Sequence, residues 1–149
     1  MTFSDEVEGV LHRAYVAACE AGDAKITPEH IALELLVEDE TVTYLERCGT
    51  DLVAVESRLR EYLERMRSDP GADVDPQPSP AFQRVVETAL QRTEAEGRET
   101  LMLRDLFLAL LDERVSTASL AILEATREPQ VFEELRTYRS AEEPGGGLT

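Results

Sequence analysis

The chain has 149 residues, of which 42% are apolar and 5% aromatic, and it contains no tryptophan. This length can bury one sizeable core, the apolar share excludes a disordered protein, and the few aromatic residues disfavour a β-sandwich or barrel. With 15 basic and 31 acidic residues, the formal charge of −16 repels phosphate backbones and anionic lipids, so neither nucleic acid nor a membrane is an expected partner.

The first predicted helix starts after Ser4, which can cap it, and stops near Gly22. Its apolar residues follow the i, i+3, i+4 spacing of an amphipathic helix: Val7, Val10, Leu11, Ala14, Tyr15 and Ala18. A second start signal follows at Thr27-Pro28-Glu29-His30, where threonine caps, proline takes the first helical position and glutamate lies by the helix dipole. The apolar stretch 31–37 then continues that helix.

A third helix is predicted around 42–48, ending at Gly49, and a fourth from about Asp51 to Arg67. Residues 68–79 carry three prolines and three aspartates, which is typical of a solvated linker. After it, helices are predicted from residue 80, over the apolar run 106–111, over 116–125 and over 130–139. Residues 141–149 lose all periodicity and are expected to form a flexible tail.

The second half repeats the first at an offset of 75 residues. This offset lays Phe82, Val85 and Ala89 over Val7, Val10 and Ala14, and the run 106–111 over 31–36. Such self-similarity indicates a tandem duplication. We therefore predict an all-α fold in which two four-helix repeats, 3–67 and 80–140, are related by a pseudo-twofold axis and share one core in a single domain, 1–140.

Sequence motifs give little support for catalysis. No Gly-rich loop followed by lysine occurs, so an ATPase site is not expected, and His12 and His30 have neither the spacing nor the neighbours of a zinc site or a catalytic triad. We expect no catalytic residue, no metal and no cofactor. A small metal-dependent hydrolase using Glu29 and His30 is a weaker alternative. Cys19 and Cys48 lack CxxC spacing and are interpreted as reduced core thiols of a cytoplasmic protein.

Three segments resemble the Clp N-terminal repeat family in order and spacing. Residues 27–36 (TPEHIALELL) are similar to its TxEHLLLALL signature, residues 48–55 (CGTDLVAV) resemble the ClpA form of the next segment, and residues 80–85 (PAFQRV) resemble the entry into the second repeat. The resemblance implies a non-catalytic docking domain of a ClpA/ClpC-type ATP-dependent unfoldase. Its implied partners are protein substrates, a ClpS-like adaptor, AAA+ ATPase modules in cis or in trans and, through them, ClpP.

The resemblance also directs attention to possible site residues. In the related ClpC proteins, the glutamates of both TEH motifs are implicated in recognising phosphorylated arginine; Glu29 matches the first, but Arg104 replaces the second. That cation would repel a guanidinium group, which favours a ClpA-like adaptor function. The residues expected at the docking surface are Glu20, Asp23, Lys25, Thr27, Glu29, His30 and Arg104. The alternative is a free-standing regulator that competes for adaptors or clients, and the isolated domain is expected to be a monomer.

Overall fold

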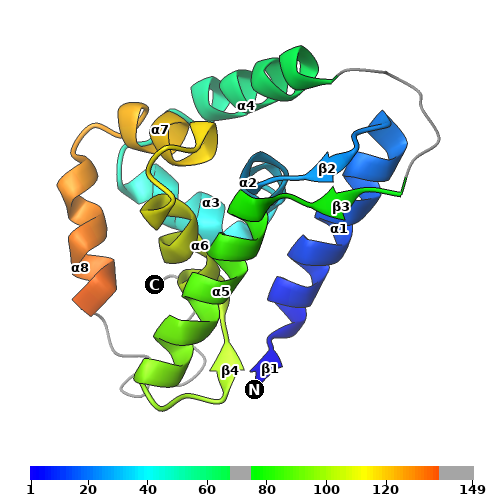
Figure 1. The fold of residues 1–149 in the computed structure, drawn as a ribbon. Helices are drawn as coiled ribbons and strands as arrows, with labels where there is room; N and C mark the ends of the chain where they lie inside the picture. The colour runs from blue at the N-terminus through cyan, green and yellow to red at the C-terminus, as the bar shows by residue number, and fades with distance from the viewer. Residues whose placement is uncertain (68–74, 138–149) are drawn as a thin grey trace.

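The computed structural model describes residues 1–67 and 75–137, which form eight α-helices, one 3-10 helix and four two-residue strands (Figure 1). The helices of the first half are α1 (Asp5–Ala21), α2 (Pro28–Leu35), α3 (Asp39–Arg47) and α4 (Leu52–Met66). Those of the second half are α5 (Pro80–Ala95), α6 (Leu103–Asp112), α7 (Thr117–Glu124), η1 (Pro129–Val131) and α8 (Phe132–Thr137). The predicted all-α fold of two four-helix repeats is confirmed.

Several helix ends fall where the sequence signals place them, although α3 begins at Asp39, three residues ahead of the predicted start near 42. The Ser4 hydroxyl accepts a hydrogen bond from the Val7 amide at 3.2 Å, and Thr27 caps α2 ahead of Pro28. Gly22 ends α1 in the left-handed region, with φ of 75°. A residue with a Cβ is strained in this conformation, so glycine is the suitable residue for the turn that leads from α1 into the next segment.

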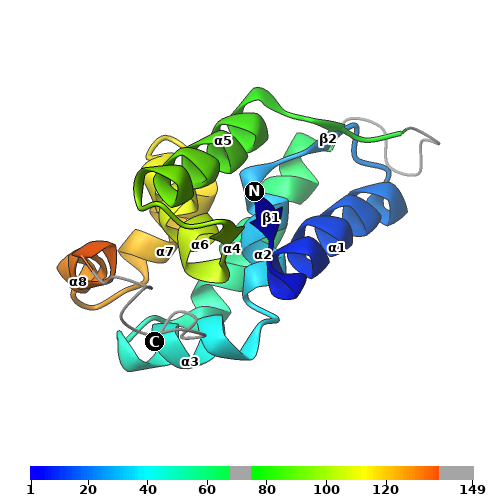
Figure 2. The same cartoon turned by 90° about the horizontal axis from the view of Figure 1, so that it is seen from below.

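Two short parallel strand pairs join the repeats reciprocally, a feature that helical periodicity did not predict. Strand β1 (Thr2–Phe3) pairs with β4 (Thr100–Leu101), and β2 (Lys25–Ile26) pairs with β3 (Gln77–Pro78). The offset of 75 residues converts one pair into the other, so each repeat gives its first strand to its partner. In Figures 1 and 2 the pairs lie at opposite ends of α1 and α5, which run in opposite directions.

A third contact between the repeats joins two threonines, one shortly after α3 and one shortly after α7. Thr50 and Thr126 form an isolated antiparallel bridge, and their hydroxyl oxygens lie 2.8 Å apart. The amide of Asp51 donates to the Ala125 carbonyl at 2.9 Å. Because the bridge joins each repeat to the matching segment of the other, it lies near the pseudo-twofold axis, and the repeats make one body.

The core is centred on α6, as the apolar run 106–111 predicted. Every residue from Leu103 to Leu111 is buried, and α2 packs beside α6. Aromatic rings of Tyr44, Phe107 and Phe132 stack edge-on or tilted, with centroids 5.5 to 6.1 Å apart, and link α3, α6 and α8. In the first repeat, however, α2 stops at Leu35 and Val37 is 63% exposed. The buried part of the apolar stretch 31–37 is therefore shorter than predicted.

Several details differ from the sequence expectations. Cys19 is exposed and Cys48 half-buried, so the interpretation of Cys19 as a core thiol is wrong; it lies on α1 outside the buried stripe. Within the predicted linker 68–79, residues 77–78 form β3. The last predicted helix, 130–139, is preceded in the structure by the 3-10 turn η1, which begins at Pro129 and takes up the predicted start. Residues 68–74, and the predicted end of the last helix and tail over 138–149, lie outside the described residues, and the domain boundaries stay predictions.

In the described part of the chain, none of the helices combines the length and apolar character that crossing a bilayer requires.

The burial of α6 predicts a large cost for shortening one of its side chains. Leu108 is 0% exposed, so replacing it by alanine should lower the free energy of unfolding by about 2–5 kcal/mol through the cavity left behind. The matched change Leu120→Ala, at a side chain that is 37% exposed, should cost less than about 1 kcal/mol. Urea unfolding followed by circular dichroism measures both, and equal losses would contradict the central position of α6.

Candidate functional site

The candidate site forms where the chain passes from α1 through β2 into α2. Gly22 turns the chain away from α1, and the amide of Asp23 donates to the Ala18 carbonyl at 2.9 Å. Strand β2 then fixes the backbone of Lys25 and Ile26 against β3. The turn, the strand pair and the Thr27 cap therefore hold this short segment from both ends.

His30 is locked at the start of α2 by bonds to both of its ring nitrogens. Nδ1 accepts a hydrogen bond from the Thr27 amide at 3.0 Å, and Nε2 lies 2.9 Å from an Asp23 carboxylate oxygen. Because Nδ1 acts as an acceptor, the proton of the neutral ring is on Nε2, which donates to Asp23. The imidazole, which is 3% exposed, thus takes the place that glutamate has in an ordinary capping box.

Asp23 joins this cap to α4. Its carboxylate accepts from the Arg67 guanidinium at 2.7 Å as well as from His30. Burial raises the pKa of Asp23, but the hydrogen bonds from Arg67 and His30, together with the positive charge of Arg67, outweigh burial and hold the pKa below its ordinary value. The ionised carboxylate is therefore the stable form, and it ties the end of α4 to the start of α2.

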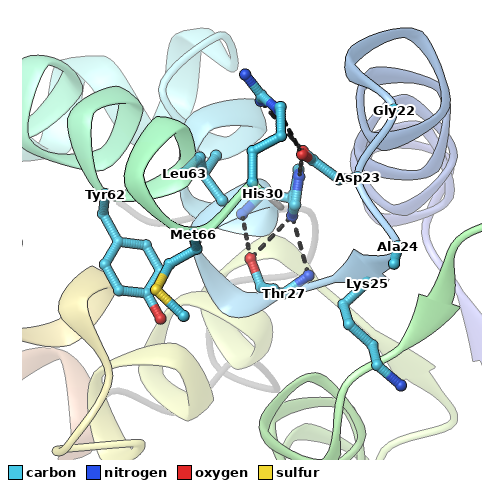
Figure 3. Close-up of a pocket in the computed structure, with 10 residues that line it drawn as sticks. Gly22, Asp23, Ala24, Lys25, Thr27, His30, Tyr62, Leu63 and Met66 are labelled. Carbon is cyan, nitrogen blue, oxygen red and sulfur yellow. Dashed lines mark hydrogen bonds and ion pairs between the residues drawn. The ribbon is translucent and has the colours of Figure 1, made fainter. Parts of the chain in front are cut away.

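A surface cavity of about 230 Å³ opens beside this network (Figure 3). One wall is the segment from Gly22 to Thr27 with His30, and the other is the last part of α4, which contributes Tyr62, Leu63, Met66 and Arg67. Figure 3 shows Tyr62 and Met66 side by side across from Lys25. Met66 is 64% exposed although it is apolar, and Lys25 is exposed too. The cavity therefore combines an apolar wall with a cationic rim.

The structure brings four of the expected site residues together at this cavity, namely Asp23, Lys25, Thr27 and His30. Glu20 is exposed in the last turn of α1 but is not part of the cavity lining. Glu29 and Arg104 are 3% and 1% exposed, so their side chains are packed inside the protein. Among the four residues at the cavity, a partner at the surface would meet exposed Lys25 and half-buried Thr27 first, because Asp23 and His30 are buried as well.

The side chain of Glu29, in the first repeat, contacts a helix of the second repeat. Its Oε2 atom accepts a hydrogen bond from the Ala118 amide at 2.9 Å, in the first turn of α7. That amide has no partner within its own helix, and a carboxylate there is favoured by the helix dipole. The glutamate of the first motif is therefore a cap supplied from the other repeat.

The offset of 75 residues lays Arg98 and Asp105 over Asp23 and His30, with the order of acid and base exchanged. Arg98 donates to Asp105 at 2.9 Å, and Asp105 accepts from the Met102 amide at 2.8 Å, as His30 does from Thr27. Burial lowers the pKa of Arg98, but the hydrogen bonds and charges of Asp105 and Glu96 together outweigh burial and raise that pKa. The start of α6 is therefore capped by Asp105, which Arg98 holds, and the start of α2 is capped by His30, which Asp23 holds. The two repeats differ in charge at these equivalent positions.

Sequence reasoning missed the part of the site that α4 provides. Tyr62, Leu63 and Met66 fitted a core-facing stripe, and Arg67 fitted a solvated charged face. The contact of Arg67 with Asp23, 44 residues away, has no local signal in the sequence.

In the described ranges, histidine, cysteine and carboxylate side chains form no group of three that could hold a metal ion. His30 also uses both ring nitrogens in the cap, so the residues that meet here suit a stable binding wall better than proton transfer.

Fold and site together define a two-repeat helical domain with a recess at the start of one second helix. The family model of the Clp repeat (R) N-terminal domain matches residues 2–125, and the chain belongs to this family. A ClpA homolog protein of Fuscovulum blasticum is 26% identical over 121 residues, which are 79% of this chain and 15% of that protein. The chaperone protein ClpB of Chlamydia pneumoniae is 28% identical over 109 residues, 72% of this chain and 13% of that one. The chain therefore spans a small part of these relatives.

Solved structures with the same fold are Clp-type N-domains. The Hsp104 N-terminal domain from Candida albicans has a TM-score of 0.77 at 16% identity, covering 98% of this chain and 93% of that one. A ClpV N-domain in complex with a VipB peptide has a TM-score of 0.66 at 17% identity, covering 91% and 86%. These similarities establish the fold.

The Asp23 network predicts a stability that depends on pH. Because the pKa of Asp23 is lowered on folding, its contribution is present above its unfolded pKa of about 3.9 and is lost as the pH falls through the folded value. Asp23→Asn should cost about 1–3 kcal/mol of unfolding free energy near neutral pH, with the difference from the native chain shrinking below about pH 4. Urea titrations over this range measure it.

The control for this series is Glu94→Gln, at an exposed carboxylate on α5, which should change the unfolding free energy by less than about 0.5 kcal/mol at either pH. A cost of Asp23→Asn that is the same in acid and at neutral pH would rule out the charged form of Asp23 as the stabilising one.

Proposed function

We propose that this chain is the substrate- and adaptor-docking domain of a ClpA/ClpC-type ATP-dependent unfoldase, a non-catalytic domain that receives proteins for Clp proteolysis in the cytoplasm. Its partners would be protein substrates and a ClpS-like adaptor, together with AAA+ ATPase modules that act with ClpP. Membership of the Clp N-terminal family supports this proposal. A ClpV N-domain solved with a peptide of VipB adds that a protein of this fold can hold a peptide.

The observation that carries the proposal is the cavity between β2 and α4. Its apolar wall includes Met66, which leaves 64% of its surface in water unless a partner covers it. Methionine is adaptable in shape, which suits a surface that receives different partners. We infer that an apolar side chain of the partner enters here, beside Tyr62 and Leu63, and that Lys25 at the rim meets an acidic group.

The docking interface is expected to be small. A cavity of about 230 Å³ holds one or two side chains, and small transient interfaces bury less than about 1,200 Å² in total. Weak binding, in the micromolar range of about −8 kcal/mol, is consistent with that area. Rapid release of this kind suits a domain that passes its partners to a separate machine.

Two exposed apolar residues of α4 allow a matched test of the docking site. Met66 lines the cavity, whereas Val53, which is 76% exposed, does not. Met66→Glu should weaken binding of a purified ClpS-type adaptor, or of a permanently unfolded client protein, by at least roughly tenfold, because a charge would be placed in the apolar contact. Val53→Glu should leave the affinity within roughly twofold.

Isothermal titration calorimetry measures the affinities, and circular dichroism checks that both variants keep the helical fold. The proposal is wrong if neither adaptor nor unfolded client binds the native chain, or if both substitutions have the same effect.

A further inference from the structure

A second cavity of about 270 Å³ shares Tyr62 with the first. It is lined by the start of α2, including Glu29, and by the connection between α6 and α7, including Glu113 and Val115. Tyr62 lines this cavity and the first one alike. The two recesses therefore meet at Tyr62 of α4.

The apolar surface continues from one recess to the other. Met66 and Tyr62 are four residues apart on α4, about 6 Å along the helix axis. Beyond Tyr62, Val115 is 86% exposed, the largest exposure among the large apolar side chains of the described residues. Exposed apolar residues at both ends of a shared wall indicate a surface longer than a single side-chain pocket.

The charges at the two ends are opposite. The first cavity is lined by Lys25 and Arg67 against the single carboxylate of Asp23, which Arg67 already neutralises. The second is lined by the carboxylates of Glu29 and Glu113 and by no basic side chain. Glu29 is engaged by the Ala118 amide, and Glu113 pairs with Arg84, a residue that is 58% exposed and therefore well screened by water.

We propose that the two cavities form one binding track for an extended segment of a partner protein, which crosses Tyr62 with an acidic residue near Lys25 and a basic residue near Glu113. Apolar side chains of the segment occupy the recesses at Met66 and Val115. An extended segment of about six residues is roughly 20 Å long. This inference rests on the proposed docking function and adds the charge order and the second contact point.

The test uses a labelled eight-residue peptide with acidic, apolar and basic positions in that order, and two versions in which either the acidic or the basic residues are replaced by serine. Fluorescence anisotropy measures their affinities for the full chain. The complete peptide should bind roughly 2–5-fold more tightly than either serine version at low salt, and the advantage should fall as salt is raised.

Two protein variants assign the charges to the two ends. Glu113→Gln should remove the advantage of the basic residues and leave that of the acidic residues, and Lys25→Gln should do the reverse. The matched control is Glu124→Gln, because Glu124 pairs with Arg58 as Glu113 pairs with Arg84, yet it lines neither cavity. The control should change no affinity by more than roughly 1.5-fold.

Lys25 offers a second readout because it is the only lysine in the sequence. Carbodiimide coupling should join its ammonium group to an acidic side chain of the bound peptide, and mass spectrometry locates the bond.

The possible outcomes separate this inference from the function on which it rests. If Met66→Glu abolishes peptide binding while Glu113→Gln behaves as Glu124→Gln does, docking at the first cavity stands and the two-cavity track is wrong. If the peptides bind but Met66→Glu changes nothing, both are wrong.

Discussion

The structure depends on each repeat completing the other. Strand β1 of the first repeat pairs with β4 of the second, β3 of the second repeat returns to β2 of the first, and Glu29 caps α7 with a bond of 2.9 Å. The carboxylate of Glu29 is buried, and an unsatisfied buried carboxylate or helix amide would be costly. Neither repeat alone satisfies these groups, so a chain with two similar halves forms one domain around α6.

This constraint also explains why the candidate site is asymmetric. At the first repeat the cap of α2 is a histidine held by Asp23, whose charge is matched by Arg67 from α4. At the second repeat an aspartate caps α6 and Arg98 holds it. The duplicated backbone therefore carries two different charge arrangements. The first leaves Lys25 and the apolar end of α4 at the surface, where a partner can reach them.

Local signals in the sequence predicted most of the fold. Ser4, Thr27 and Gly22 act on their own helices, and the run 106–111 is apolar on every side, so the element limits and the buried helix followed from short patterns. The strand pairs were missed because a strand of two residues is too short to show an alternating pattern in the sequence. Four site residues were found from the segment 23–30, which leads into the first turn of α2, but Arg67 and Met66 reach the site through packing of α4, which no local pattern encodes. Likewise, Glu29 resembled a surface group because its partner Ala118 is 89 residues away.

The most direct test of whether each repeat completes the other is native-state hydrogen exchange, measured on the native chain and on the variant Glu29→Ala. If the repeats form one cooperative unit, the most protected amides of α2 and of α6 open with one common free energy. The substitution then lowers both by the same amount, about 1–3 kcal/mol. A loss of protection confined to α6 and α7, with α1 and α2 unchanged, would show that the repeats open independently and would contradict the account.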